Sequence, residues 1–189
     1  KTMKLIAHLM LLNVIWWATI LSAVHVPQFP WLPGIWIVVM IALALTRKLY
    51  KPGDLLAGCA LLAIGLVLDT IWIQLGWINH QVAWPFAGFC PLWLATLWFT
   101  VGVDFRMSLG WAHRRWLIGI LATGLSGPSS YWGGAALGVA IIPTSTAWAF
   151  ALGLFITWAI IFPLFSAGIA YYETRFGDPN GKVSSFEKH

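Results

Sequence analysis

Long apolar runs separated by short polar or proline-rich breaks dominate the hydrophobicity pattern of the chain. Six runs are predicted to form helices, at residues 5–24, 34–46, 55–78, 91–111, from 115 onward, and 144–172. A helix needs about 20 mostly apolar residues to cross the roughly 30 Å hydrocarbon core of a bilayer, and most of these runs approach that length. The pattern therefore predicts an all-α fold, a polytopic membrane helical bundle with six transmembrane segments.

The breaks between the runs carry residues that end or begin helices. Pro27, Pro30 and Pro33 stop the first run, because proline lacks the backbone donor that a helix interior needs. In the turn at 51–54, Asp54 is expected to be the N-cap of the third helix. The fifth run is predicted to be broken at Gly127-Pro128, where glycine and proline together permit a sharp change of direction.

Hydroxyl groups surround the predicted break in the fifth segment. Ser126, Ser129, Ser130 and Tyr131 could satisfy backbone groups that a broken helix leaves without partners at membrane depth. Broken helices of this kind often build binding sites in membrane proteins. A kinked helix with small residues for packing accounts for the same sequence, and both interpretations stay open here.

Composition narrows the class of protein further. Hydrophobic residues make up 60% of the 189 positions and charged residues only 9%, whereas soluble domains carry roughly 25% charged residues. Soluble and disordered classes are therefore excluded. We expect a single transmembrane domain over residues 1–172 and a polar cytoplasmic tail over residues 173–189.

The placement of the basic residues gives an orientation. With six crossings, all 11 fall on one side: Lys1, Lys4, Arg47, Lys48, Lys51, Arg106, Arg114, Arg115, Arg175, Lys182 and Lys188. The loops on the opposite side, 25–33, 79–90 and 139–143, contain no Lys or Arg. Positive loops stay in the cytoplasm, so both termini are predicted to be cytoplasmic. The net charge of +5 is accordingly interpreted as an orientation signal, and no nucleic-acid partner is expected.

Asp69 is the clearest ionisable residue inside a predicted span. Helical spacing places it on one face with small and aromatic residues, namely Gly58, Leu62, Gly65, Trp72 and Gly76. Small residues mark close helix contacts, so Asp69 is expected to point into the bundle. It could be a neutral carboxyl hydrogen-bonded to a neighbouring helix, or a ligand anchor or proton-handling group.

Other polar and aromatic residues inside the spans are weaker candidates. Asp104 should lie roughly 10 Å from Asp69 in height, which argues against a carboxylate pair for acid/base catalysis. Arg106 is expected to reach the inner interface, and Asn13 to form an interhelical hydrogen bond. The deep tryptophans either pack against helices or form the wall of a flat or long apolar ligand: Trp16, Trp17, Trp72, Trp98 and Trp158.

Metal-binding and catalytic patterns are not readable in the sequence. The histidines at 8, 25, 80 and 113 have no partner at helical i, i+4 spacing, and no Ser/His/Asp grouping is apparent. Cys59 and Cys90 are expected near opposite sides of the membrane, so they should not form a disulfide. These observations favour a protein that is not an enzyme, with no catalytic residues and no metal ligands assigned.

Four stretches carry a family resemblance, and together they cover about residues 10–140. They are 13–17, Gly65-Leu66-Val67-Leu68-Asp69 with Leu75-Gly76, Pro91-Leu92-Trp93-Leu94 with Leu97-Trp98-Phe99, and Gly127-Pro128-Ser129-Ser130-Tyr131-Trp132-Gly133-Gly134 with Leu137-Gly138. They resemble a bacterial inner-membrane family known as domain of unknown function 2878. Asp104-Phe105-Arg106 departs from the Asn-His-Ser-like run expected there. The resemblance implies a bacterial inner-membrane location and a lipid-related context, without an activity.

The sequence leads to one main hypothesis and two alternatives. The main one is a non-enzymatic subunit that binds a ligand or forms a complex, with a bound lipid, quinone or pigment as the cofactor. The candidate ligand-binding residues are Asn13, Asp69, Trp72, Trp98, Asp104, Ser126, Ser129, Ser130 and Tyr131. Expected partners are membrane lipids and a membrane protein partner or a second copy of the chain. The alternatives are a small proton-coupled transporter using Asp69 and a membrane enzyme acting on lipid.

Overall fold

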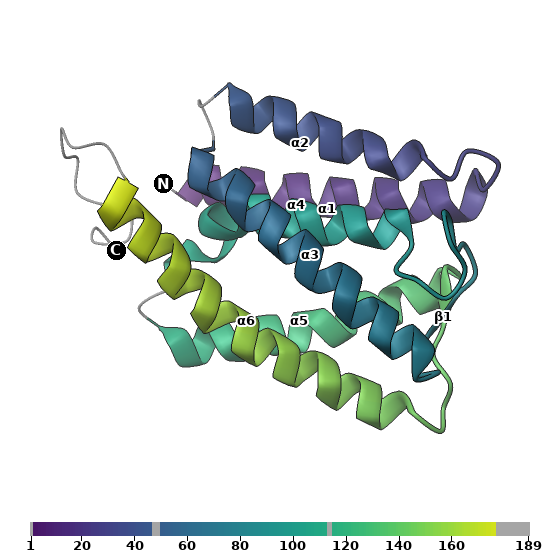
Figure 1. Ribbon diagram of the computed structural model, residues 1–189. Coiled ribbons are helices and arrows are strands. Elements are labelled where there is room, and N and C mark those ends of the chain that lie inside the picture. The colour runs from purple at the N-terminus through teal and green to yellow at the C-terminus, as the bar shows by residue number, and fades with distance from the viewer. Residues whose placement is uncertain (1, 47–49, 113–114, 177–189) are drawn as a thin grey trace.

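A computed structural model describes residues 2–46, 50–112 and 115–176, which form a bundle of helices (Figure 1). The helices are α1 (Thr2–His25), α2 (Ile35–Leu45), α3 (Pro52–Gln74), α4 (Leu92–Leu109), α5 (Trp116–Ala136) and α6 (Ala147–Phe176). Two short 3-10 turns, η1 (Leu32–Gly34) and η2 (Gly110–Ala112), precede α2 and follow α4. The predicted helical membrane bundle is confirmed.

The number of helices able to cross a membrane differs from the sequence prediction. By length and composition, three are long and apolar enough among the described residues, over His8–His25, Pro52–Gln74 and Ala147–Phe176, and not six. The 11 residues of α2 rise only about 16 Å. The other two are less apolar, because α4 carries Asp104 and Arg106 and α5 is rich in glycine and serine.

α5 runs without a break through Gly127-Pro128, so the predicted interruption is wrong. Pro128 removes one backbone donor from the helix. Hydroxyl groups on either side of it bond to carbonyls of the preceding turn: Ser126 Oγ donates to Thr123 O at 3.1 Å, and Ser129 Oγ to Leu125 O at 2.8 Å. These bonds satisfy the two hydroxyls within the helix, and α5 continues through the proline.

Basic side chains and connecting strands mark the two ends of the bundle. The start of α1, the first turn of α3 and the last turn of α6 lie together at the left in Figure 1. Lys51, Arg106 and Arg175 belong to this end, which we call the basic end. At the opposite end, β1 (Asn79–His80) pairs antiparallel with β2 (Ala140–Ile141). The sequence analysis did not predict this pairing, which joins two of the loops that lack Lys and Arg.

Glycines bring α3 and α4 close together. A Cβ atom at Gly58 would lie 2.4 Å from Val103 Cγ2, and one at Gly102 would lie 2.7 Å from Ala57 O. The face of α3 predicted to point inward is largely buried, with Gly58, Gly65 and Asp69 among its buried residues. This tight contact holds α3 against α4 and so positions Asp69 next to Trp98 of α4.

The ends of two helices differ from the predicted boundaries. α3 begins at Pro52 with Lys51 as N-cap, so Asp54 is the third helical residue; its Oδ2 accepts the Lys51 backbone N–H at 2.7 Å. α6 continues to Phe176, into the segment predicted to be a polar tail. The remainder of that tail, 177–189, lies outside the described residues, and the domain division stays a prediction.

Candidate functional site

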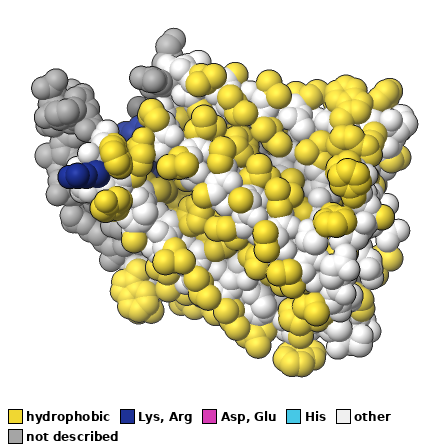
Figure 2. Space-filling model, in the orientation of Figure 1, with side chains coloured by type: hydrophobic (Ala, Val, Ile, Leu, Met, Phe, Trp, Pro, Cys, Tyr) yellow, Lys and Arg dark blue, Asp and Glu magenta, His cyan; other side chains and the backbone are white. Residues whose placement is uncertain are grey.

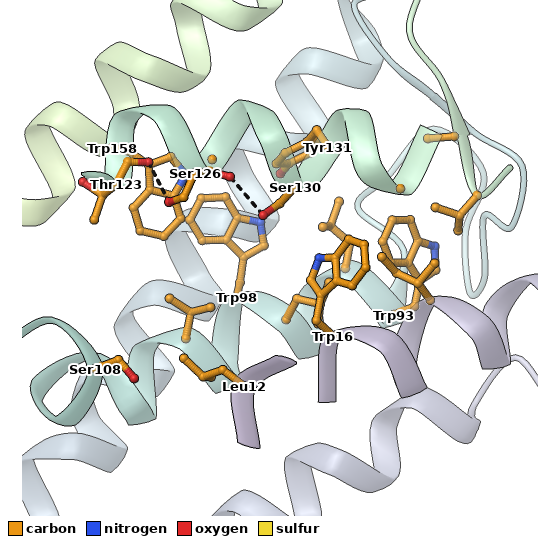
Figure 3. A pocket seen from close by; sticks show the side chains of 18 of the residues that line it. Leu12, Trp16, Trp93, Trp98, Ser108, Thr123, Ser126, Ser130, Tyr131 and Trp158 are labelled. Carbon is orange, nitrogen blue, oxygen red and sulfur yellow. Dashed lines mark hydrogen bonds between the residues drawn. The ribbon is translucent and has the colours of Figure 1, made fainter. Parts of the chain in front are cut away.

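A cavity of about 260 Å³ lies between α1, α4 and α5, closed by Trp158 of α6 and by the strand pair. Its walls are mostly apolar and aromatic (Figure 3). The lining residues are Leu9, Leu12, Trp16, Ile20, Ile78, His80, Trp93, Leu94, Leu97, Trp98, Val101, Phe105, Ser108, Leu109, Thr123, Ser126, Gly127, Ser130, Tyr131, Gly134, Val139, Ala140 and Trp158. An apolar pocket with a few polar groups is typical of ligand sites.

The cavity opens sideways between α1 and α5. Leu9 on one rim is 40% exposed, and Ser126 and Ser130 on the other rim are also exposed. α5 packs chiefly on α6, while α1 packs chiefly on α4, so the two rims belong to different halves of the bundle. The opening therefore lies on the side of the bundle, between these two helices.

One wall of the cavity is held in place by Asp69. The Trp98 indole Nε1 donates to Asp69 Oδ2 at 2.5 Å, and the Tyr131 hydroxyl donates to the two carboxylate oxygens at 2.8 and 3.0 Å. Asp69 itself is fully buried and does not line the cavity. Its carboxylate therefore orients two aromatic side chains that do line it, which makes Asp69 a positioning residue.

Two glycines allow the aromatic wall to close. Trp98 stacks on Trp158 with ring centroids 5.3 Å apart and planes 3° from parallel. A Cβ at Gly65 would lie 2.2 Å from Trp98 Cγ, and a Cβ at Gly127 would lie 2.3 Å from Trp158 Cδ1. The stacked pair is thus clamped between the backbones of α3 and α5, and glycine is needed at both positions.

The hydroxyl groups of α5 give the cavity its polar side. Thr123, Ser126 and Ser130 line it, and each donates its hydroxyl proton to a backbone carbonyl of α5: Gly119 O, Thr123 O and Ser126 O. Their oxygens keep lone pairs that can accept a hydrogen bond. This row can accept a bond from a hydroxyl or amide of a ligand, but it offers no charge.

Two ring systems of the lining have buried nitrogens without a hydrogen-bond partner. They are both ring nitrogens of His80 and the indole nitrogen of Trp158. Burial lowers the pKa of His80 from 6.5 to about 4, so its ring is neutral at pH 7. His80 packs edge-on against Trp93, with centroids 5.3 Å apart. Buried polar groups normally have a hydrogen-bond partner. His80 and Trp158 both line the cavity, so a ligand there lies next to their unpartnered nitrogens.

Asp104 belongs to a separate buried cluster that joins α1, α4 and Tyr50, which lies two residues before α3. Its Oδ1 lies 2.6 Å from His8 Nδ1 and accepts the Tyr50 hydroxyl at 2.8 Å, while Ser108 donates to its Oδ2. Burial, helped by the charge of Asp104, raises the pKa of the Tyr50 phenol. Only Ser108 of this cluster lines the cavity. Asp69 and Asp104 share no hydrogen-bond partner.

Arg106 is held in a buried ion pair at the basic end of the bundle. Its guanidinium forms two hydrogen bonds with Asp54, at 2.8 and 2.6 Å, and both side chains are buried. Lys51 pairs with Glu173 at 2.5 Å, so the first turn of α3 is tied to the last turn of α6. Within the described part of the chain, no group of three His, Cys, Asp or Glu residues could hold a metal ion.

The candidate residues from the sequence divide into two sets. Trp98, Ser126, Ser130 and Tyr131 line the cavity, with Asp69 directly behind them. Like Asp69, the four other candidates do not line the cavity; they are Asn13, Trp72, Asp104 and Ser129.

Two of those four have contacts that explain their position. Asn13 is exposed and donates to Leu9 O of its own helix at 2.8 Å, so the predicted interhelical bond is wrong. Trp72 is buried behind Tyr131, with ring centroids 6.2 Å apart, and it also contacts Phe150. Trp72 therefore supports the wall from behind.

Some lining residues were not named as ligand-binding candidates. Trp16 and Trp158 were predicted either to pack against helices or to form the wall of an apolar ligand, and His80 and Trp93 were not assigned a binding role. His80 has no neighbouring motif in the sequence that would mark it as a binding residue. The pairing of β1 with β2 brings it to the cavity. Both cysteines are free, as predicted, with Cys59 exposed and Cys90 buried.

The fold and the cavity define a class, that of helical membrane bundles with an apolar cavity between the helices. The family described as protein of unknown function (DUF2878) matches residues 5–164, so the chain belongs to this family. No curated protein and no solved structure matches the chain.

Proposed function

We propose that the protein binds a long apolar molecule from the bilayer in the cavity between α1 and α5, without catalysing a reaction. The observation that carries the proposal is the cavity itself, with apolar walls, a row of hydroxyls on α5 and an opening toward lipid. A lipid chain or the tail of a quinone reaches such a cavity without leaving the membrane. The lipid-related context expected from the sequence agrees with this role.

The shape of the cavity favours a chain over a flat pigment. Its lining runs from Leu9 to Ile20 on α1 and from Thr123 to Gly134 on α5, a rise of roughly 16 Å on each helix. This length is about half of the hydrocarbon core, the depth that one lipid chain occupies in its leaflet. A volume of about 260 Å³ spread over that length makes a narrow slot.

The position of Asp69 supports binding over transport or catalysis. Trp98 and Tyr131 lie between its carboxylate and the cavity, and both donate hydrogen bonds to it. A proton carrier or an acid/base catalyst would need access to that carboxylate. The two alternative functions, a proton-coupled transporter and a lipid enzyme, can be tested directly. Uptake into vesicles that depends on pH, or lipid turnover, would replace the binding proposal if it disappears in Asp69→Asn.

Two neighbouring serines provide a matched test of the binding site. Ser130→Phe places a large ring in the cavity, whereas Ser129→Phe places the same ring on the exposed side of α5, away from it. If the ring removes contacts worth about 1.4 kcal/mol, the affinity for the ligand falls tenfold. The amount of ligand that co-purifies with Ser130→Phe should then be roughly a tenth of the wild-type amount.

Mass spectrometry of organic extracts from purified protein measures the co-purified molecules. Ser129→Phe should match the wild type. Equal amounts of every extracted species in the wild type and both variants would refute the binding site.

We also propose that the protein lies in the bacterial inner membrane with the basic end in the cytoplasm. The grouping of Lys51, Arg106 and Arg175 at one end supports this orientation. In a Cys59→Ala background, a membrane-impermeant thiol reagent added to whole spheroplasts should label Ala87→Cys, in the loop of the strand end, but not Arg175→Cys. The reverse labelling pattern would invert the orientation. Labelling of both variants would mean that the two ends are on one side.

A further inference from the structure

A second cavity lies between α3 and α6 at the basic end of the bundle, with a volume of about 370 Å³. Figure 2 shows the face on which α3 and α6 lie, largely covered by hydrophobic side chains, with Lys or Arg side chains at its left end. This groove shares no lining residue with the cavity between α1 and α5. It therefore needs an explanation of its own.

The apolar part of the groove has a floor of small residues. Ala57, Ala60 and Gly168 line it, between larger residues such as Leu56 and Leu164. A Cβ at Gly168 would meet no atom within 4 Å, so open space lies directly above that residue. Leu56 and Leu164 are themselves more than 60% exposed, as expected for side chains that face lipid. The width and polarity of this part suit a hydrocarbon chain.

The charged part of the groove has one accessible cation. Asp54 and Arg106 form a buried pair with each other, and the Glu173 side chain is only 6% exposed. The Lys51 side chain is 51% exposed, and its ammonium has three N–H donors, of which Glu173 Oε1 accepts one. The two cations of the lining are matched by two carboxylates, and the Lys51 ammonium belongs to the most exposed of these four side chains.

We propose that this groove binds a glycerophospholipid, with the phosphate on the Lys51 ammonium and one acyl chain along the floor between α3 and α6. The exposed Lys51 ammonium at the basic end lies where the headgroups of a leaflet lie, and the apolar floor extends from it toward the bilayer centre. Opposite chemistry at the two ends of one groove matches the two ends of a phospholipid. The lipid would join the first turn of α3 to the last turn of α6, alongside the Lys51–Glu173 pair.

Gly168→Leu tests the chain-binding part without strain in the protein. The leucine fills open space over the floor, whereas Ala167→Leu, one position earlier, adds the same side chain on the exposed surface of α6 outside the groove. Lys51→Gln removes the cation at the rim while keeping the length of the side chain. Each variant is embedded in nanodiscs containing phosphatidylglycerol, phosphatidylcholine or diacylglycerol, and native mass spectrometry counts the lipids retained after release.

The expected pattern separates the two parts of the site. Wild type and Ala167→Leu should retain one phospholipid of either kind and about fivefold less diacylglycerol, since a basic residue near a lipid surface contributes roughly 1 kcal/mol. Lys51→Gln should abolish this preference for phosphate, and Gly168→Leu should lower retention of all three lipids. Equal retention by Gly168→Leu and Ala167→Leu, or an unchanged preference in Lys51→Gln, would overturn the proposal. Ser130→Phe should not change this lipid, which keeps the result independent of the ligand in the other cavity.

Discussion

Gly65→Ala should dismantle the aromatic wall of the cavity between α1 and α5. The added Cβ would lie 2.2 to 2.4 Å from three atoms of the Trp98 indole, which Trp158 blocks from the other side. The ring must move, and Asp69 then loses the hydrogen bond from Trp98. Overpacking together with the loss of one hydrogen bond to a buried carboxylate costs about 2–5 kcal/mol.

Thermal unfolding in detergent measures this cost. At 2–4 °C per kcal/mol for a chain of this size, the melting temperature of Gly65→Ala should fall by roughly 5–20 °C. The co-purified ligand should be lost as well. Gly168→Ala is the control, because its Cβ meets open space, and its melting temperature should stay within a few degrees of the wild type. A Gly65→Ala protein as stable as the wild type would show that Trp98 is not clamped.

Asp104→Ala should be the most destabilising change outside the cavity. Asp104 accepts hydrogen bonds from Tyr50 and Ser108 and pairs with His8, so its removal leaves three buried polar groups without their acceptor. Removing one member of a buried pair typically costs about 3–5 kcal/mol. The cluster joins α1, α4 and Tyr50, which lies two residues before α3. Its loss should therefore loosen the basic end of the bundle.

Asn13→Ala is the matched control for Asp104→Ala. Both remove a polar side chain from a helix, but Asn13 is exposed and bonds only within α1. Its melting temperature should change little, while that of Asp104→Ala should fall by roughly 6–20 °C. If the two variants melt at similar temperatures, the cluster around Asp104 does not hold the helices together. Asp104→Asn, which keeps one carbonyl oxygen as acceptor, should lie between them.

Local sequence signals predicted the helices and the burial of Asp69 well. Apolar run length placed all six helices to within a few residues at most ends. Helical spacing put Gly58, Gly65 and Asp69 on one buried face, because a helix with a fixed period of 3.6 residues converts sequence directly into direction.

The predictions failed where a neighbouring element decides the outcome. Gly127-Pro128 indicated a broken helix, but α5 continues through both residues and Trp158 of α6 packs on Gly127. Asn13 was expected to bond to another helix, yet its side chain is exposed and donates to Leu9 O of its own helix. His8 was set aside as a lone histidine, and its partner Asp104 comes from a helix 96 residues away. Such pairings depend on which helices meet, which periodicity does not encode.

The cavity itself was only partly predictable. Serines and deep tryptophans pointed to a polar and aromatic region, and Trp98, Ser126, Ser130 and Tyr131 do line it. His80 reaches it only because β1 pairs with β2. A sequence pattern can indicate which side chains leave the lipid, but the void between them depends on how the two halves of the bundle fit together.

The most direct measurement for the central claim is a crystallographic density map of the protein grown from a lipid phase. The account predicts an elongated density, about as long as one leaflet is deep, between α1 and α5 and in contact with Trp98 and Ser130. It predicts that Trp98 still donates to Asp69 beside this density. A map in which α5 closes onto α1 and the space is filled by protein side chains would contradict it.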